Sequence, residues 1–415
     1  MSTHPFLNKN RFLLGTFSTN CSGGMTVSKL PDRWKADWES NLRLALMMDE
    51  AGMDFMLPIA RWVGYGGETN FHGYVLETVT WATGLLAKTK NLTIFATVHT
   101  TANHPVVIAK QIATMDQISG SRVGLNIVAG WNKPEYEALG LNLPDDHETR
   151  YEYAQEWYDI IKKLWTTEGR FDWDGKYFKL KNVHSDPKPA VLPPIYNAAG
   201  SGLGREFAGR NANFLFTPAI DLDRSKTEVA EIKADAKQQA GRDVGVLTFS
   251  HVICCPTKEE AEKRWDYILE NIDWDATDNL VRLQFAHAQS FPHDLLALIR
   301  ERMAAGHGGF PLVGTPQDVA DGICALHEAG FSGTTLSFFD YAEEFPYFRD
   351  NVLPILEERG IRLTAIQPGN AVQLLAHRLP PPASGCRCAS IYTPLSTAQT
   401  CFNGVYKPLT TGLSA

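Results

Sequence analysis

The chain has 415 residues, of which 44% are hydrophobic and 21% are charged, and its formal net charge is −8. That length suffices for one large barrel with insertions or for two ordinary domains. The negative charge argues against a protein that coats nucleic acid, and no stretch approaches the roughly 20 apolar residues of a membrane-spanning helix.

Short apolar runs alternate with amphipathic stretches along most of the chain. The runs predict strands at residues 12–15, 55–57, 92–97, 123–128, 194–197, 214–216, 244–252 and 333–338. Helices are expected at 38–50, 75–87, 105–118, 146–164, after 204, at 223–239, at 258–272 and up to about 358.

This alternation favours parallel strands joined by right-handed crossovers. About eight such units over roughly 360 residues predict an α/β fold, a (β/α)8 TIM barrel with insertions. A doubly wound open sheet is the alternative, but no G-x-G-x-x-G follows the first strand.

Two local signals refine this prediction. Asp145 and Glu148 have the spacing of a capping box, so the fourth helix is expected to start between them. Residues 171–178 have the pattern of a hairpin outside the repeat, with Asp174-Gly175 as its turn.

A typical barrel of this kind has about 250 residues, and the residues beyond that number lie mainly in two insertions, at 167–192 and 274–312. The second insertion ends in the glycine-rich stretch 306–309, which makes it a candidate lid. Residues 366–415 carry no Asp or Glu, which predicts a barrel domain at 1–365 followed by an irregular, poorly ordered tail.

Polar residues at the C-terminal ends of barrel strands are candidate site residues. In 92–97 the more apolar face is expected to point outward to the helices, which places Thr97 at the rim of the interior. The same argument turns Asn126 of 123–128 inward, beside Gly124, which leaves room for a ligand. The alternative is that Thr97 and Asn126 only satisfy backbone groups of the loops.

The stretch Gly-Ser-Gly-Leu-Gly at 200–204 follows the fifth strand and opens a helix. Its backbone N–H groups and the Ser201 hydroxyl suit a phosphate, and Arg150-Tyr151 could add a charge-assisted contact. The alternatives are an ordinary loop and an exposed salt-bridge arginine.

Other chemistries have little support in the sequence. No His-x-His follows the first strand, no G-x-S-x-G occurs, and no metal site is expected. His72, His99 and His104 lie in predicted loops at the active end, where each is an acid–base candidate or a solvated loop histidine. Glu343-Glu344 is typical of a solvated helix start.

Seven cysteines form a sparse set without a C-x-x-C pair, which favours a reducing cytoplasm. The first residues contain no apolar core like that of a secretion signal. A cytoplasmic location is therefore expected.

The run Gly-Leu-Asn-Ile-Val-Ala-Gly-Trp-Asn-Lys-Pro-Glu-Tyr at 124–136 resembles the signature of bacterial-luciferase-like, reduced-flavin-dependent monooxygenases, in particular the pyrimidine and dimethyl-sulfone types. Residues 94–97, 113–120 and 337–341 match as well, and residues 20–29 resemble the sulfone enzymes. The similarity covers about residues 10–360.

This resemblance implies reduced FMN, delivered by a separate NAD(P)H:flavin reductase, and a homodimer or homotetramer. The family's flavin contacts fall on Ala60, Arg61, Asn126, Glu135, Arg150, Tyr151 and Ser201. An oxygen pocket of the pyrimidine type would fall on Leu57, Thr97, Asn126 and Trp131. The chain departs from its relatives at Tyr74, where they have histidine; here the histidine is His72.

The expected activity is insertion of one oxygen atom from O2 into a small substrate, with water as co-product. A sulfone, a sulfonate and a heterocyclic amide are the candidates, and C–S, C–N or C–halogen cleavage could follow. The alternatives are deazaflavin-dependent hydride transfer on the same fold and a flavin-binding protein without catalysis.

Overall fold

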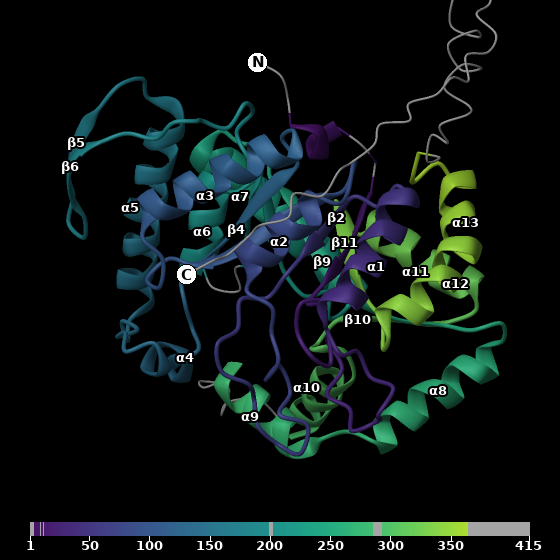
Figure 1. Cartoon of the computed structure of the whole chain (residues 1–415). Coiled ribbons are helices and arrows are strands. Elements are labelled where there is room, and N and C mark those ends of the chain that lie inside the picture. The colour runs from purple at the N-terminus through teal and green to yellow at the C-terminus, as the bar shows by residue number, and fades with distance from the viewer. Residues whose placement is uncertain (1–3, 9, 11, 199–201, 285–292, 364–415) are drawn as a thin grey trace, which may run out of the picture. The chain divides into compact units, whose positions relative to one another are not determined.

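The computed structural model describes residues 4–8, 10, 12–198, 202–284 and 293–363, with the backbone alone at residues 5, 8 and 293–299. Parallel strands close into a barrel with helices around it (Figure 1). The order around the barrel is β1 (Leu13–Phe17), β2 (Phe55–Leu57), β3 (Thr93–His99), β4 (Val123–Val128), β7 (Ile195–Ala198), β8 (Phe214–Phe216), β9 (Gly245–Cys254) and β11 (Gly333–Ser337), which pairs with β1. These are the strands predicted from the sequence, and the (β/α)8 TIM barrel is confirmed.

Amphipathic helices cover the outside of the barrel because each places an apolar stripe against the sheet. They are α1 (Trp38–Glu50), α2 (Thr78–Leu86), α3 (Pro105–Ser119), α5 (His147–Thr166), α6 (Gly202–Asn211), α7 (Leu222–Ala240), α8 (Lys258–Glu270), α11 (Pro316–Glu328), α12 (Tyr341–Asn351) and α13 (Leu353–Glu358). The predicted cap of α5 was wrong: Asp146, not Asp145, accepts the Thr149 N–H at 2.7 Å. Both aspartates precede the helix, and Asp146 is its N-cap, with an extended backbone that aims its carboxylate at that N–H.

Besides the short helix η1 (Pro5–Asn8), four elements were not predicted. Strand β10 (Phe310–Gly314) pairs with the C-terminal half of β9, on the side away from β11, so it is outside the closed ring. Helix α4 (Lys133–Ala138) follows β4, and the expected insertion at 274–312 contains α9 (Trp274–Gln284) and α10 (His293–Gly306). The predicted hairpin is present as β5 (Phe171–Asp174) and β6 (Lys179–Val183).

Aromatic side chains fill the barrel interior. Phe6, from the short helix η1 (Pro5–Asn8), contacts Phe55, Phe95 and Phe214 edge to face, with ring centroids 5.2–5.5 Å apart. A Cβ at Gly124 would lie 2.3 Å from the Phe95 ring. Gly124 therefore leaves room for Phe95 and not for a ligand, contrary to expectation, and space for chemistry lies at the C-terminal ends of the strands.

The predicted domain boundary at 365 and the tail at 366–415 lie outside the described residues, which end at 363. Within the described part of the chain, none of the helices is long and apolar enough to cross a membrane. The same residues contain no group of three or more His, Cys, Asp or Glu that could hold a metal ion.

The two glutamates at the start of α12 differ in their surroundings. Glu343 is exposed and pairs with Arg43 at 2.7 Å, as expected for a solvated helix start. Glu344 is partly buried, and burial raises the pKa of its carboxyl to about 7. The expectation of a solvated side chain was therefore wrong for Glu344.

A Glu344→Gln variant is expected to gain stability relative to the native chain as pH rises from about 4.5 to about 7. In that window the folded chain holds a proton that the unfolded chain releases, so the native free energy of unfolding falls with rising pH. Glutamine keeps an oxygen for the Phe339 N–H and has no proton to lose. The expected gain is about 1–2 kcal/mol above pH 7.

Urea unfolding of the native chain and of Glu344→Gln between about pH 5 and pH 8 measures this difference. Glu343→Gln, which changes the exposed neighbour, is the matched control. Parallel pH profiles for the native chain and Glu344→Gln would contradict the prediction.

Candidate active site

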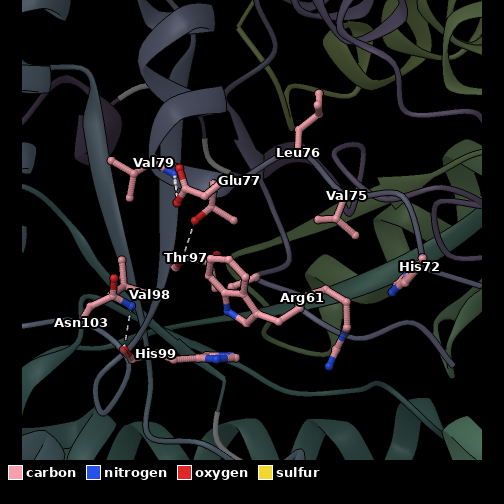
Figure 2. A pocket seen from close by; sticks show the side chains of 14 residues that line it. Arg61, His72, Val75, Leu76, Glu77, Val79, Thr97, Val98, His99 and Asn103 are labelled. Carbon is pink, nitrogen blue, oxygen red and sulfur yellow. Dashed lines mark hydrogen bonds between the residues drawn. The ribbon is translucent and has the colours of Figure 1, made fainter. Parts of the chain in front are cut away.

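A cleft of about 200 Å³ opens at the C-terminal ends of β2 and β3. Its walls are the segment that follows β2, the first turn of α2 and the end of β3 (Figure 2). Its lining includes Ala60, Arg61, His72, Thr97 and His99. The cleft therefore lies where barrel enzymes carry their chemistry. Of these five residues, three were predicted to contact flavin or oxygen, and the two histidines were acid–base candidates.

A chain of hydrogen bonds links β2, β3 and β4 beside this cleft. Thr97 and Asn126 are directly opposite each other in the sheet, and the Asn126 side-chain amide donates to Thr97 Oγ1 at 3.1 Å. The Thr97 hydroxyl in turn donates to the Pro58 carbonyl at 2.6 Å. These hydrogen bonds fix the Asn126 amide N–H₂ toward Thr97. Asn126 Oδ1 is therefore buried and has no partner among the described residues.

Leu57 completes this group. It is the last residue of β2, directly before Pro58, and it packs in the apolar interior of the barrel with 1% of its surface exposed. Leu57 is thus the neighbour in sequence of the carbonyl that Thr97 binds, and its side chain belongs to the apolar interior of the barrel.

A buried ion pair forms a second part of the site. Arg61 Nη1 lies 2.9 Å from Glu135 Oε1, and the two side chains are 4% and 0% exposed. Glu135, in the first turn of α4, also accepts the Trp62 backbone N–H at 2.9 Å. Arg61 Nε and Glu135 Oε2 have no partner among the described residues, so each can still bind a ligand.

Arg61 keeps its charge although it is buried. Burial lowers its pKa, but the nearby Tyr65 and Glu135 more than compensate, so that the pKa of Arg61 is raised. The guanidinium carbon lies 4.9 Å from the Tyr65 ring centroid and 5.2 Å from that of Trp131. Trp131 therefore lies on the ion-pair side of the site.

Arg150 differs from the other buried arginines in the described residues. Arg61 pairs with Glu135, Arg362 pairs with Asp54 at 2.7 Å, and Arg122 donates to backbone carbonyls and to a threonine hydroxyl. Arg150, only 8% exposed, has neither a hydrogen bond nor an ion pair with any described residue. A guanidinium without a direct hydrogen-bond or ion-pair partner is available to an anionic ligand.

Helices α5 and α6 pack side by side in the same direction. Tyr151 contacts Phe207 with ring centroids 5.8 Å apart, and one turn later Gln155 hydrogen-bonds Asn211. Their N-termini therefore lie near each other, and both ends attract anions. Ser201, predicted to contact a phosphate, lies outside the described residues.

The histidines at the active end differ from the solvated loop residues described as the alternative. His99 is buried, and burial together with the nearby Arg61 lowers its pKa to about 3. His72 is buried too, and the same two causes lower its pKa. His104 is exposed and caps α3 by accepting the Val106 N–H. Only His104 fits the solvated description.

The insertion that was expected to be a lid packs against the segment that follows β2. The Asp273 carboxylate accepts hydrogen bonds from the backbone N–H and hydroxyl of Thr69, and Asn279 donates to the Tyr65 carbonyl at 3.1 Å. In Figure 1, α9 and α10 lie beside the loops at this end of the barrel. Sequence reasoning did not anticipate these contacts, because they join segments about 200 residues apart.

Residues 13–333 match the profile of luciferase-like monooxygenases. The chain belongs to this family. The resemblance drawn from residues 124–136 is thereby confirmed.

Curated relatives include pyrimidine monooxygenase RutA of Bradyrhizobium sp. (strain BTAi1), 32% identical over 361 residues, which cover 84% of this chain and 98% of the relative. RutA of Escherichia coli K12 is 29% identical over 354 residues, with coverage of 84% and 92%. Among solved structures, DmoA from Hyphomicrobium sulfonivorans has a TM-score of 0.76 at 22% identity and covers 87% of this chain and 91% of its own. An F420-dependent secondary alcohol dehydrogenase has a TM-score of 0.62 at 16% identity, with coverage of 84% and 99%. The solved structures show that the fold is shared.

Proposed function

We propose that this chain is the oxygenase component of a two-component monooxygenase that uses reduced FMN and O2. The observation that carries the proposal is the Thr97–Asn126 pair beside the cleft, with Asn126 Oδ1 buried and unpartnered. Family membership and the similarity to pyrimidine monooxygenases support it. By the same family argument, we propose a cytoplasmic homodimer or homotetramer, served by a separate NAD(P)H:flavin reductase.

The residues present fit an isoalloxazine and a phosphate. Arg61 Nε, Asn126 Oδ1 and Glu135 Oε2 are a donor and two acceptors without partners, and the edge of a flavin ring offers both kinds of group. Arg150, which forms no ion pair with a described residue, suits the phosphate, and Tyr151 and Ser201 would flank it. Ala60 would lie against the ring.

Bound reduced FMN supplies two electrons that activate O2, so that one oxygen atom enters the substrate and the other leaves as water. The Asn126 amide N–H that is not given to Thr97 would donate, without carrying a charge, where negative charge develops on oxygen, and Thr97 would hold the amide in place. Leu57 would exclude water from that place, Trp131 would cover the Arg61–Glu135 pair, and this pair would orient the ring.

A mixing experiment tests this proposal. The purified chain is added to reduced FMN and O2, and flavin absorbance is followed with and without candidate substrates. We expect the chain to change the course of flavin reoxidation and to form an oxygenated product. Heterocyclic amides come first in the substrate panel, since the curated relatives are pyrimidine monooxygenases, and sulfones and sulfonates follow. Reoxidation at the rate of free FMN would count against the proposal.

Two alternatives have distinct outcomes in the same assay. Hydride transfer predicts that the chain binds a deazaflavin in preference to FMN and needs no O2. A binding protein without catalysis predicts FMN binding without substrate-dependent oxygen uptake.

An Arg150→Gln variant is expected to bind FMN about 10- to 100-fold more weakly, because it loses a charge-assisted contact with the phosphate. Fluorescence titration measures the change. Riboflavin, which lacks the phosphate, should bind the variant and the native chain equally. Arg170→Gln, at an exposed arginine before β5, is the matched control. Equal losses for FMN and riboflavin would show that Arg150 does not contact the phosphate.

A further inference from the structure

The cleft contains a buried histidine that the flavin contacts proposed above leave unused. His99 is the last residue of β3, lines the cleft and is 4% exposed. Thr97 lies two residues earlier on the same strand and also lines the cleft, so the two side chains share one face of the sheet, roughly 6–7 Å apart along the strand. A molecule that contacts Thr97 from the cleft is therefore within reach of the His99 ring.

Tyr136 of α4 holds the His99 ring in place. The two rings are nearly parallel, with an angle of 15° between them and centroids 6.0 Å apart, and Tyr136 is 1% exposed. Gly130, at a φ of 110°, makes room for this tyrosine, because a Cβ there would collide with the Tyr136 hydroxyl. The loop after β4 thus places Tyr136 against His99 and sets the plane of the imidazole.

His99 differs from the other ionisable side chains that line the cleft, because each of those has a partner within the protein. Arg61 has its ion pair, His72 Nε2 donates to a backbone carbonyl at 2.7 Å, and Glu77 accepts two backbone N–H groups at the start of α2. The Nδ1 atom of His99 is buried without a partner, and neither of its ring nitrogens takes part in a hydrogen bond with a described residue. Both nitrogens are therefore available to a ligand.

The His99 ring is an uncharged imidazole. Burial and the nearby Arg61 lower its pKa to about 3, so that it carries no proton beyond its single N–H at neutral pH. A neutral imidazole has one donor and one acceptor nitrogen, and no described residue fixes which nitrogen carries the hydrogen. His99 can therefore either donate or accept a hydrogen bond.

Oxygen chemistry beside Thr97 and Asn126 requires the reactive atoms of the flavin ring to lie near these two side chains. Those atoms are C4a and the adjacent N5, of which only N5 forms hydrogen bonds. N5 accepts a hydrogen bond in the oxidised ring and carries a hydrogen in the reduced ring, whereas a 5-deazaflavin has a carbon at this position. In Figure 2 the His99 ring extends toward the side of the cleft where Arg61, proposed to orient the flavin, lies.

We propose that His99 binds the cofactor through a hydrogen bond between its imidazole and flavin N5, and that this contact makes the site prefer a flavin to a 5-deazaflavin. The proposal rests on the oxygenase function proposed above and assigns its choice of cofactor to one residue. The imidazole N–H donates to N5 of the oxidised ring, and the other tautomer accepts from the N5–H of the reduced ring. A 5-deazaflavin leaves the imidazole nitrogen without a partner in the buried site, which costs affinity.

Binding calorimetry with oxidised FMN and 5-deaza-FMN, which differ at this one ring position, tests the contact. We expect the native chain to bind FMN about fivefold to tenfold more tightly than 5-deaza-FMN. His99→Phe keeps a ring against Tyr136 but removes both nitrogens, so it should bind the two molecules equally. His99→Gln supplies an amide and should restore part of the preference. His184→Phe, at an exposed histidine after β6, is the matched control and should keep the native preference.

Equal binding of FMN and 5-deaza-FMN by the native chain would overturn the contact without any variant. A native preference that persists in His99→Phe would overturn it too, because His99 would then only pack against Tyr136. The titrations need no turnover, so the failure of the oxygenase proposal shows up separately, as reoxidation of reduced FMN at its free rate.

Discussion

An Asn126→Ala variant is expected to lose about a hundredfold or more in kcat/KM for substrate oxygenation while it still binds FMN. The Asn126 amide holds the Thr97 hydroxyl, and its own oxygen is buried without a partner where the cofactor and O2 are proposed to meet. Alanine removes both groups, whereas the phosphate contact at Arg150 remains. Oxygen uptake coupled to product formation measures the loss, and flavin fluorescence measures the affinity that persists.

Two further variants sharpen this test. Asn126→Asp keeps the shape of the side chain but adds a negative charge where charge develops on oxygen, so it should be at least as inactive as the alanine variant. Asn351→Ala, at an exposed asparagine near the end of α12, should leave the activity unchanged. Full activity in either Asn126 variant would show that Asn126 has no role in oxygen chemistry.

The barrel was predictable because its strands are apolar runs that alternate with helices in a fixed order. The apolar faces of β3 and β4 also gave the inward direction of Thr97 and Asn126: their hydrogen bond puts both on one face of the sheet, and Phe95 on that face packs in the barrel interior. Strand β10 was missed because Phe310–Gly314 is half-buried and follows a predicted insertion, so no periodic signal separates it from a loop. Gly124 was misread because the Phe95 ring that fills its space is 29 residues away in the sequence.

Less of the site than of the fold was visible in the sequence. The family resemblance named Arg61 and Glu135 separately, but nothing in the sequence paired residues 74 positions apart. The burial of His72 and His99 was missed for the same reason: single-residue patterns at loops indicate solvent, whereas residues distant in sequence, among them His307 beside His72 and Tyr136 beside His99, help to cover these rings. The absence of an ion partner at Arg150, among the described residues, likewise requires the fold.

A Glu135→Leu variant is expected to lower the free energy of unfolding by about 3–5 kcal/mol and to abolish oxygenation. It leaves the Arg61 guanidinium, only 4% exposed, without its counter-ion, and it removes the acceptor of the Trp62 N–H. Both losses act on the segment that forms the cleft wall. The affinity for FMN should therefore fall together with the free energy of unfolding. Urea unfolding measures the stability, and fluorescence titration measures FMN affinity.

The double variant Arg61→Met with Glu135→Leu separates charge from packing. If the loss of stability comes from an uncompensated buried charge, removing Arg61 as well should recover most of it, because a buried ion pair and an apolar pair of similar size are often comparable in stability. Oxygenation should stay abolished, since the donor and acceptor proposed to orient the flavin are both gone. A double variant as unstable as Glu135→Leu would show that the acceptor for Trp62, and not the ion pair, holds this segment in place.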